Sequence, residues 1–503
     1  MMRCRSFLLL PLLLLCPLLL SAIEPPLPQA PEPPKTEIRA VWLTTIYGLD
    51  WPKRPARDDY EVKVQQQDLC LLLDSLQQAN FNLVFLQVRL RGDVIYRSAI
   101  EPASPTFSGR TGQLPHYDPL AFAIEECHRR GMECHAWFVT FPVGTEKKVR
   151  DQGKLSVVKR RPELCKLHQG EWYLDPGVPE TADYLVAMVD ELVRNYNIDG
   201  IHFDYIRYPD RPKNFPDKQL YNKQGKKMKI DDWRRDNINR IVTKLYDRVK
   251  EIKPWVQVSS SPLGKYNRIE KVPNAGWTAY ESVYQDPKQW MKEEKHDMVV
   301  PMMYYLNNNF FPFVDNWVEN GNGRLVVPGL GAYRMEKSEE DWTVDDVTEQ
   351  MYYSRANGAI GNAFFRCSHV LDDSKGFFNE LKNTYYRYPA QLPPLTWLND
   401  DIPPTPDEIL VERSGEFLKL SWEKPEGCAE ELTYTIYYSL SDPIDTSRAA
   451  SILIAGIHAT HCYLPINPEE EMLFNFQLTA SSRYHIESAP SRETLYYLTN
   501  HPK

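Results

Sequence analysis

The segment Ile201-His202-Phe203-Asp204-Tyr205-Ile206-Arg207-Tyr208-Pro209 indicates a buried strand that ends in a group of polar and aromatic side chains. Apolar Ile201 and Phe203 are two positions apart, as they are on one face of a strand. Asp204, Arg207 and two tyrosines follow at once. The active sites of parallel α/β barrels lie at the carboxyl ends of the strands. The segment therefore predicts an active-site strand, with an Asp–Arg ion pair that only closes a strand end as the alternative.

The chain on either side of this stretch alternates between strand and helix patterns. Apolar strand patterns lie at 38–45, 83–89, 132–138, the quoted stretch, 256–261, 298–304, 325–330 and 360–365. Helical periodicity lies between most of them, at 62–79, 119–131, 181–196, 231–252, 344–351 and 376–386. This pattern, over about 350 residues, predicts an α/β fold of the (β/α)8 TIM-barrel type at residues 37–390. A doubly wound sheet is the alternative, but no Gly-x-Gly-x-x-Gly follows the first strand, so no nucleotide cofactor is expected.

The C-terminal part of the chain changes from a helical period to a period of two. A Pro-rich linker at residues 391–406 precedes this change. Alternation typical of strands follows within residues 407–500, as in Phe417-Leu418-Lys419-Leu420-Ser421-Trp422. Short strands with turn signals over about a hundred residues predict a small all-β sandwich. The strand with Trp422 and the Tyr-rich strand after it resemble a fibronectin type III module, which is more often a spacer or docking unit than a catalyst.

The N-terminus has the pattern of a secretion signal. Two arginines precede a Leu-rich run at residues 7–20, and small residues follow it, which predicts a signal peptide at residues 1–22. Residues 23–36 are Pro-rich and predict an extended tether. We therefore expect an exported protein, periplasmic, cell-surface or extracellular, with no transmembrane span in the mature chain. A lipid anchor at Cys16 is disfavoured, because Leu15 before it is too large for a lipoprotein cleavage site.

Composition narrows the class of ligand. The net charge is −9, and no run of Lys and Arg is long enough for a nucleic-acid footprint. No Cys-x-x-Cys pair or metal-ligand spacing is present, so neither a metal site nor a disulfide framework is expected. Aromatic residues make up 12% of the chain, which is more than a core alone usually needs. Aromatic faces, carboxylates and guanidinium groups at a barrel mouth suit a sugar.

Cleavage of a glycosidic bond needs two carboxyl groups that flank the bond. Asp204 is the first candidate, and Asp93 or Glu101, on the loop after the second strand, is the second. Glu281 is a further candidate, and the distance between the two carboxyl groups, hence retention or inversion, stays open. His202 fits a core histidine better than a ligand. The residues expected to bind substrate at the mouth are Trp42, Gln87, Arg89, His135, Trp137, His202, Tyr205, Arg207, Tyr304 and Tyr333.

Several separate motifs, in order along the chain, resemble one known family. They are Glu37-Ile38-Arg39-Ala40-Val41-Trp42, Gln87-Val88-Arg89 with Gly92-Asp93, Glu101-Pro102, Tyr117-Asp118-Pro119-Leu120, the run from Gly131 to Phe138, and Asp199 to Tyr205 with Arg207-Tyr208-Pro209. Together they resemble the bacterial glycosyl hydrolase-like 10 family over residues 37–390. The resemblance implies a (β/α)8 barrel, action on cell-wall or exopolysaccharide glycans, and a site at Asp204 with Asp93 and Arg89. Tyr205 stands where many members have a second acid, and Met302 stands where many have Gln.

These observations predict an exported glycosidase that cleaves a bacterial cell-wall (peptidoglycan-type) or other polysaccharide by carboxylate acid/base chemistry. The alternative is a non-catalytic glycan-binding protein on a degenerate barrel. A third possibility is a surface-assembly protein whose sandwich docks a partner at the cell surface. Hydrolysis would indicate the glycosidase, and binding without hydrolysis would indicate the glycan-binding protein. Loss of function on deletion of residues 403–503 would indicate the surface-assembly protein.

Overall fold

The computed structural model describes residues 32–428, 431–440, 443–467, 469 and 471–499. The predicted signal peptide and most of the predicted tether lie outside these residues. Among the described helices, none combines the length and the apolar composition that crossing a bilayer requires.

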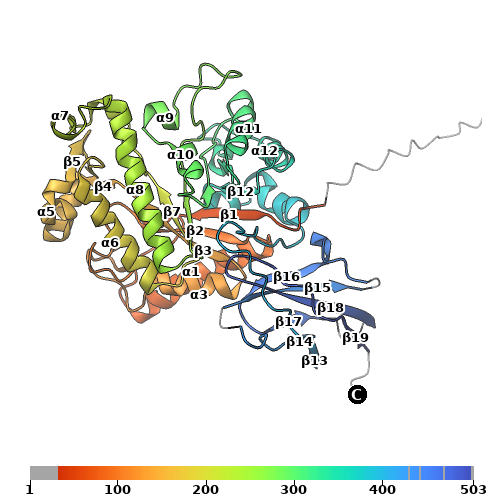
Figure 1. Ribbon diagram of the computed structural model, residues 1–503. Helices are drawn as coiled ribbons and strands as arrows, with labels where there is room; N and C mark the ends of the chain where they lie inside the picture. Colours follow the sequence, from red (N-terminus) through yellow and green to blue (C-terminus); the bar gives the residue numbers. More distant parts are fainter. Residues whose placement is uncertain (1–31, 429–430, 441–442, 468, 470, 500–503) are drawn as a thin grey trace, which may run out of the picture. The chain divides into compact units, whose positions relative to one another are not determined.

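A curled, parallel sheet forms the centre of the larger part of the protein (Figure 1). Its order is β10-β9-β8-β7-β3-β2-β1-β12-β11. Each of the eight segments that the sequence predicts contains or overlaps at least one of these strands, and the strands are buried along nearly their whole length. Their bounds are β1 (Ile38–Leu43), β2 (Leu83–Arg89), β3 (Glu133–Val139), β7 (Gly200–Asp204), β8 (Gln257–Ser260), β9 (Met298–Val299), β10 (Leu325–Val326), β11 (Gly329–Leu330) and β12 (Gly361–Phe364).

The segment at residues 325–330 joins the two ends of this sheet. Its first half, β10, pairs with β9, and its second half, β11, pairs with β12. The N–H of Val327 donates to the carbonyl of Val299, and the N–H of Ala363 donates to the carbonyl of Pro328. Proline has no N–H to donate, which fits the break between β10 and β11 at this point.

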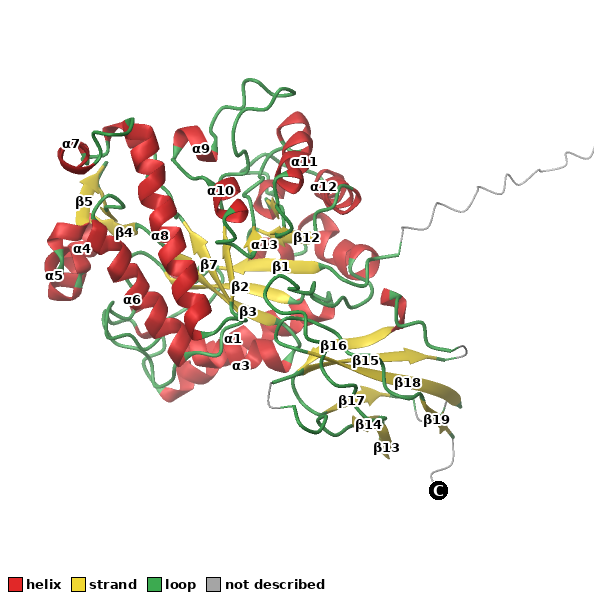
Figure 2. Ribbon diagram, viewed as in Figure 1, coloured by secondary structure: helices red, strands yellow, loops and turns green. Residues whose placement is uncertain are grey.

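Helices cover the outside of the sheet (Figure 2). Most of the long ones are amphipathic and bury one stripe, and the side chains of Asp58, Asp118 and Thr343 cap three of their N-termini. Asp118 accepts hydrogen bonds from the N–H groups of Leu120 and Ala121, and Pro119 occupies the first position of α3, as its sequence predicts. The main helices are α1 (Asp59–Gln78), α3 (Pro119–Arg129), α6 (Pro179–Asn195), α8 (Ile230–Ile252), α11 (Phe311–Glu319) and α12 (Val344–Ala356).

Residues 140–178, which carry no predicted element, form a small insert after β3. A three-stranded antiparallel sheet of β4 (Pro142–Thr145), β6 (Glu171–Leu174) and β5 (Cys165–His168) is its main feature. The short helices α4 (Glu146–Gln152) and α5 (Val157–Arg160) connect its strands. Because the insert follows the carboxyl end of β3, it lies at the end of the sheet where Asp204 is found.

The C-terminal part is a sandwich of two antiparallel sheets, as the period of two predicts. One sheet has the order β13-β14-β17, and the other has the order β16-β15-β18-β19. Trp422 packs against Tyr434, and Leu420, Ile436 and Phe476 fill the core between the sheets. The bounds are β13 (Leu410–Ser414), β14 (Phe417–Ser421), β15 (Thr433–Ser439), β16 (Ile452–Ile457), β17 (His461–Pro465), β18 (Met472–Ser481) and β19 (Thr494–Leu498).

A buried histidine beside the sheet makes stability depend on pH. His296 precedes β9, stacks on Trp290 and is hydrogen-bonded to the hydroxyl of Ser260 at 2.8 Å. Burial lowers its pKa from 6.5 to about 4. The unfolded chain therefore binds more protons between these two values, so stability should fall as the pH drops from 6.5 toward 4. The contribution is about 3 kcal/mol, from the size of that pKa shift.

The measurement is the free energy of unfolding, by denaturant titration, at several pH values from 7 to 4. Because glutamine cannot gain a proton in this range, His296→Gln should show a shallower loss of stability than the native chain. The control is His116→Gln, since the side chain of His116 is 68% exposed. If His296→Gln and the native chain lose stability in parallel, His296 is not the group responsible.

Candidate active site

Asp204 is the last residue of β7, and its carboxylate is held from three sides. Oδ1 accepts hydrogen bonds from the N–H of Tyr205 at 2.7 Å and from the hydroxyl of Ser261 at 3.0 Å. Oδ2 accepts a hydrogen bond from Nε1 of Trp137, on β3, at 3.0 Å. The residue is 6% exposed. Burial raises the pKa of Asp204, although these donors and the charge of Arg207 act in the opposite direction.

The backbone turns sharply directly after Asp204. Tyr205 has a φ of 49°, in the left-handed region that side chains other than glycine rarely adopt. This conformation ends β7 and points the Tyr205 N–H back at the Asp204 carboxylate. Strained residues of this kind cluster at functional sites, where the surrounding structure holds them in place.

Aromatic rings lie beside Asp204, since Trp137 donates to its carboxylate and the Asp204 charge acts on Tyr304. Phe365, directly after β12, is at their centre, with ring centroids 5.9 Å from Tyr304, 5.9 Å from Tyr333 and 6.4 Å from Trp137. Burial raises the pKa of Tyr304, and the nearby Asp204 carboxylate raises it further. The rings therefore remain neutral and offer apolar faces next to a carboxyl group, which is what the apolar face of a pyranose requires.

Charged groups also lie near Tyr205. The guanidinium of Arg207 lies 4.7 Å from the ring centroid of Tyr205, and its Nη1 donates to Asp210 at 3.2 Å. Arg207 is 7% exposed, whereas the side chain of Asp210 is 62% exposed. Arg91 and Glu171, the latter on β6 of the insert, form a half-buried ion pair at 2.9 Å. The charges of Arg91 and Asp210 both act on the pKa of Tyr205.

The structure gives the other predicted carboxyl groups different surroundings. Glu101 is enclosed, accepts two hydrogen bonds from Arg89 at 2.6 and 2.8 Å, and accepts a third from the hydroxyl of Tyr184. Asp93 is 1% exposed and pairs with Lys148 at 2.7 Å. Glu281 lies on the short helix α9 (Ala279–Ser282), half-exposed and paired with Arg268.

The predicted substrate-binding residues divide into two groups. Trp137, Tyr205, Arg207, Tyr304 and Tyr333 lie around Asp204. The others are enclosed and take part in contacts within the protein. Nε1 of Trp42 donates to His202, and the ring of His135 meets Glu133 at the opposite end of β3. Gln87 accepts hydrogen bonds from the N–H groups of Thr45 and Ile46. Arg89 forms an ion pair with Glu101 and donates to the carbonyl of Thr140.

Four residues in and around this site are absent from the predicted mouth set or have no role assigned there. Phe365 ends the last predicted strand, so the rule that selects residues at strand ends could have found it. No sequence pattern indicates Asp210, which follows a proline in a polar loop, or Glu171, which lies in the insert that the sequence does not predict. Ser261 ends its predicted strand and is the hydroxyl that hydrogen-bonds Asp204.

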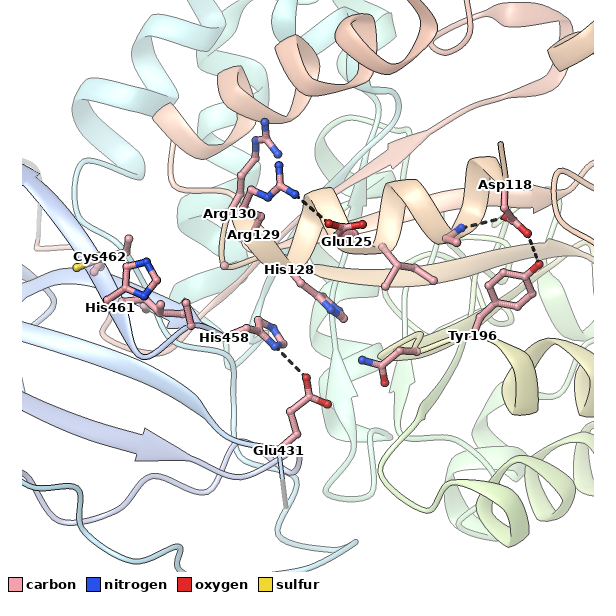
Figure 3. Close-up of a pocket in the computed structure, with 18 of the residues that line it drawn as sticks. Asp118, Glu125, His128, Arg129, Arg130, Tyr196, Glu431, His458, His461 and Cys462 are labelled. Atoms are coloured by element: carbon pink, nitrogen blue, oxygen red, sulfur yellow. Dashed lines mark hydrogen bonds and ion pairs between the residues drawn. The ribbon is translucent and has the colours of Figure 1, made fainter. Parts of the chain in front are cut away.

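A large cavity, of about 1140 Å³, lies away from Asp204, between α3 and the edge strands β16 and β17 of the sandwich (Figure 3). The rings of His128 and His458 stack there with centroids 4.3 Å apart. His458 also meets Glu431 at 3.5 Å, and His128 pairs with Asp199, which precedes β7. The cavity therefore borders the N-terminal end of the sheet, opposite the end that carries Asp204.

A buried carboxyl with a raised pKa, among aromatic rings at the carboxyl ends of parallel strands, is typical of the active-site end of a barrel-like α/β enzyme. Comparison with known proteins agrees with this class. The chain belongs to the glycosyl hydrolase-like 10 family, which residues 37–317 match.

Two relatives and one solved structure illustrate the similarity. Glycosyl hydrolase YngK of Bacillus subtilis is 29% identical over 485 residues, which are 91% of this chain and 93% of that protein. Glycosyl hydrolase DigH of Escherichia coli is 31% identical over 353 residues, which are 63% of this chain and 80% of that protein. The PgaB (BpsB) glycoside hydrolase domain of Bordetella bronchiseptica has 16% identity and a TM-score of 0.48, and the match covers 69% of this chain and 98% of that domain.

Proposed function

We propose that this protein is a glycosidase that cleaves a polysaccharide, with Asp204 as its central acid. The observation that carries the proposal is the Asp204 carboxyl, buried, hydrogen-bonded by Trp137 and Ser261, and bordered by half-buried aromatic rings. Membership of a glycosyl hydrolase-like family supports it.

We infer that the curled sheet is a closed (β/α)8 barrel, because residues 325–330 are hydrogen-bonded to β9 on one side and to β12 on the other. We infer that the sandwich is of the fibronectin type III kind. Its three-stranded and four-stranded antiparallel sheets, and the packing of Trp422 on Tyr434, support that inference.

Asp204 suits the role of proton donor to the leaving oxygen. Burial raises its pKa, so its carboxyl keeps a proton to a higher pH than an exposed aspartate does. The sugar ring would stack on Tyr304 or Tyr333, and Arg207 would donate hydrogen bonds to hydroxyl groups. After donation, the Asp204 carboxylate is stabilised by the donors that already point at it.

The second carboxyl group should be able to reach a water molecule or the anomeric carbon. Glu101 is fully engaged by Arg89 and Tyr184, and Asp93 is enclosed and paired with Lys148. Asp210 is the better candidate, because its carboxylate is exposed and is held by Arg207, whose guanidinium lies over the residue next to Asp204. Asp210 would then activate a water molecule or stabilise positive charge on the sugar.

The substrate proposed is a bacterial cell-wall glycan of the peptidoglycan type or another polysaccharide outside the cell. The Leu-rich N-terminal run supports export, since it has the pattern of a signal peptide. The sandwich would dock the enzyme to a cell surface or partner.

The experiment is a screen of purified protein against peptidoglycan glycan strands and a panel of polysaccharides. We expect release of new reducing ends from at least one polymer, with products identified by mass. Binding of a polymer without any release of reducing ends would support the glycan-binding alternative instead. Absence of both would contradict the proposal.

A further inference from the structure

Exposed aromatic rings are confined to one end of the curled sheet. Among the described residues of 37–390, the aromatic side chains of Tyr47, Tyr60 and Trp277 are exposed, at 77%, 73% and 47%. Tyr47 follows β1, Tyr60 lies in the first turn of α1, and Trp277 follows β8. In a parallel sheet, these positions all belong to the carboxyl ends of the strands, which is the end that carries Asp204.

The turn that presents Tyr47 is fixed from both sides. Gln87, on β2, accepts hydrogen bonds from the N–H groups of Thr45 and Ile46 at 3.0 and 2.9 Å. The carbonyl of Leu49 accepts a hydrogen bond from Arg366, after β12, at 3.1 Å. The ring of Tyr47 is therefore held out to solvent by a rigid turn and not by a loose loop.

Tyr47 also has a costly backbone conformation. Its φ is 56°, in the left-handed region that tyrosine rarely adopts, and Gly48 after it has a φ of 67°. An asparagine or glycine would fit this position with less strain. A large, strained and exposed aromatic side chain offers nothing to the core, so its ring is the feature that needs an explanation.

Trp277 is presented in a similar way by the segment after β8. Ala275 and Ala279 on either side of it are buried, at 2% and 0% exposure. Lys265 holds both, since its Nζ donates to the carbonyl of Ala275 at 2.9 Å and its own carbonyl accepts from the N–H of Ala279 at 2.8 Å. The chain is thus anchored two residues before and two residues after an indole that faces solvent.

The two rings stand on different sides of Asp204. β8 is the direct neighbour of β7 in the sheet, whereas β1 is separated from β7 by β3 and β2 on the other side. Along the order of the sheet, β7 and its Asp204 therefore lie between the strand that leads to Trp277 and the strand that leads to Tyr47.

We propose that Tyr47 and Trp277 are stacking platforms for two separate sugar units of one glycan chain that lies across the Asp204 site. The protein would then bind a long polysaccharide at several units and cleave it internally, away from the chain ends. This inference rests on the proposed function, since it names the form of the glycan that the same site takes.

A glycan chain fits these rings better than a protein surface does. Protein partners bind contiguous apolar patches of several hundred Å². Here the rings are on separate loops, on opposite sides of a carboxyl group. Sugar units in a chain repeat at intervals, and each offers one apolar face that a single ring can cover.

The test compares the native protein with Tyr47→Asn and Trp277→Ala on the polymer found by the screen and on short oligosaccharides from it. Asparagine removes the ring but tolerates the left-handed backbone, so folding is preserved. We expect KM for the polymer to rise about tenfold in each variant, from loss of one aromatic contact. The loss should shrink as the substrate becomes shorter, and Tyr47→Phe and Trp277→Phe should restore most of it.

The matched control is Tyr497→Ala, which removes a 58% exposed ring from β19 of the sandwich. It should leave polymer cleavage unchanged.

Equal losses in all three variants, or losses that do not depend on chain length, would overturn the inference while leaving hydrolysis established. If the native protein binds the polymer without cleaving it, the same comparison made on binding affinity decides the inference, and the proposed hydrolysis alone fails. If the native protein neither binds nor cleaves any polymer, both are overturned.

Discussion

Replacement of Asp204 by asparagine is expected to reduce glycan cleavage by about 1,000-fold, the usual order for loss of a general acid. Asparagine has the shape of aspartate, and its carbonyl can accept the hydrogen bonds of the Tyr205 N–H and the Ser261 hydroxyl. Its amide nitrogen replaces the oxygen that accepts from Trp137, and it has no proton to give. The fold should be unaffected, because the buried charge-bearing group is replaced by a neutral one of equal size. The measurement is the rate of reducing-end release, with the thermal unfolding transition as the check on folding.

The pH dependence gives the same prediction a second readout. Because burial raises the pKa of Asp204, the protonated form persists to a higher pH than in an exposed aspartate, and cleavage should decline as the pH rises through that value. The declining limb should be missing from the residual activity of Asp204→Asn. Asp93→Asn is the matched control, since that carboxylate is equally enclosed but pairs with Lys148. Full activity in Asp204→Asn, or equal losses in both variants, would show that the chemistry lies elsewhere.

The second large effect concerns stability and not catalysis. Arg89→Met should lower the free energy of unfolding by about 3–5 kcal/mol, because it leaves the enclosed Glu101 carboxylate without its partner. Arg89 and Glu101 are both fully buried and form two parallel hydrogen bonds. The measurement is denaturant unfolding of the variant and of the native protein under the same conditions.

The control for this prediction is an ion pair of similar geometry at the surface. Glu125 and Arg129 meet at 3.0 Å on α3, with side chains 69% and 60% exposed. Glu125→Gln should cost less than about 1 kcal/mol, since solvent screens exposed pairs. Comparable losses in the two variants would contradict the distinction between a buried structural pair and a solvated one.

Retained cleavage in folded Glu101→Gln would confirm that Glu101 supports the site without taking part in the reaction.

The main sheet is predictable from sequence because its strands are continuous buried runs. β1 and β2, for example, are buried at every position, and the amphipathic helices between the strands carry a clear stripe. The insert after β3 is not predictable in this way. Its strands are four residues long and contain charged residues such as Lys166 and Glu171, so no period extends far enough to be recognised.

The site is predictable in part for a related reason. Asp204 and Trp137 lie at or near strand ends, and the topology of a parallel sheet brings such ends together. How far inside the protein a residue lies along its strand is harder to predict. His202 precedes Asp204 on β7 by two residues, and His135 precedes Trp137 on β3 by two. Both histidines lie inside the protein. The pairing of Arg89 with Glu101 depends on the path of the loop between them, which no periodicity records.

The measurement that tests the central claim most directly is a crystal structure of Asp204→Asn with an oligosaccharide from a polymer that the native protein cleaves. The account predicts a glycosidic oxygen within about 2.6–3.2 Å of the residue 204 side chain, the reach of a proton donor. A sugar bound only elsewhere, such as in the cavity between α3 and the sandwich, with residue 204 untouched, would contradict it.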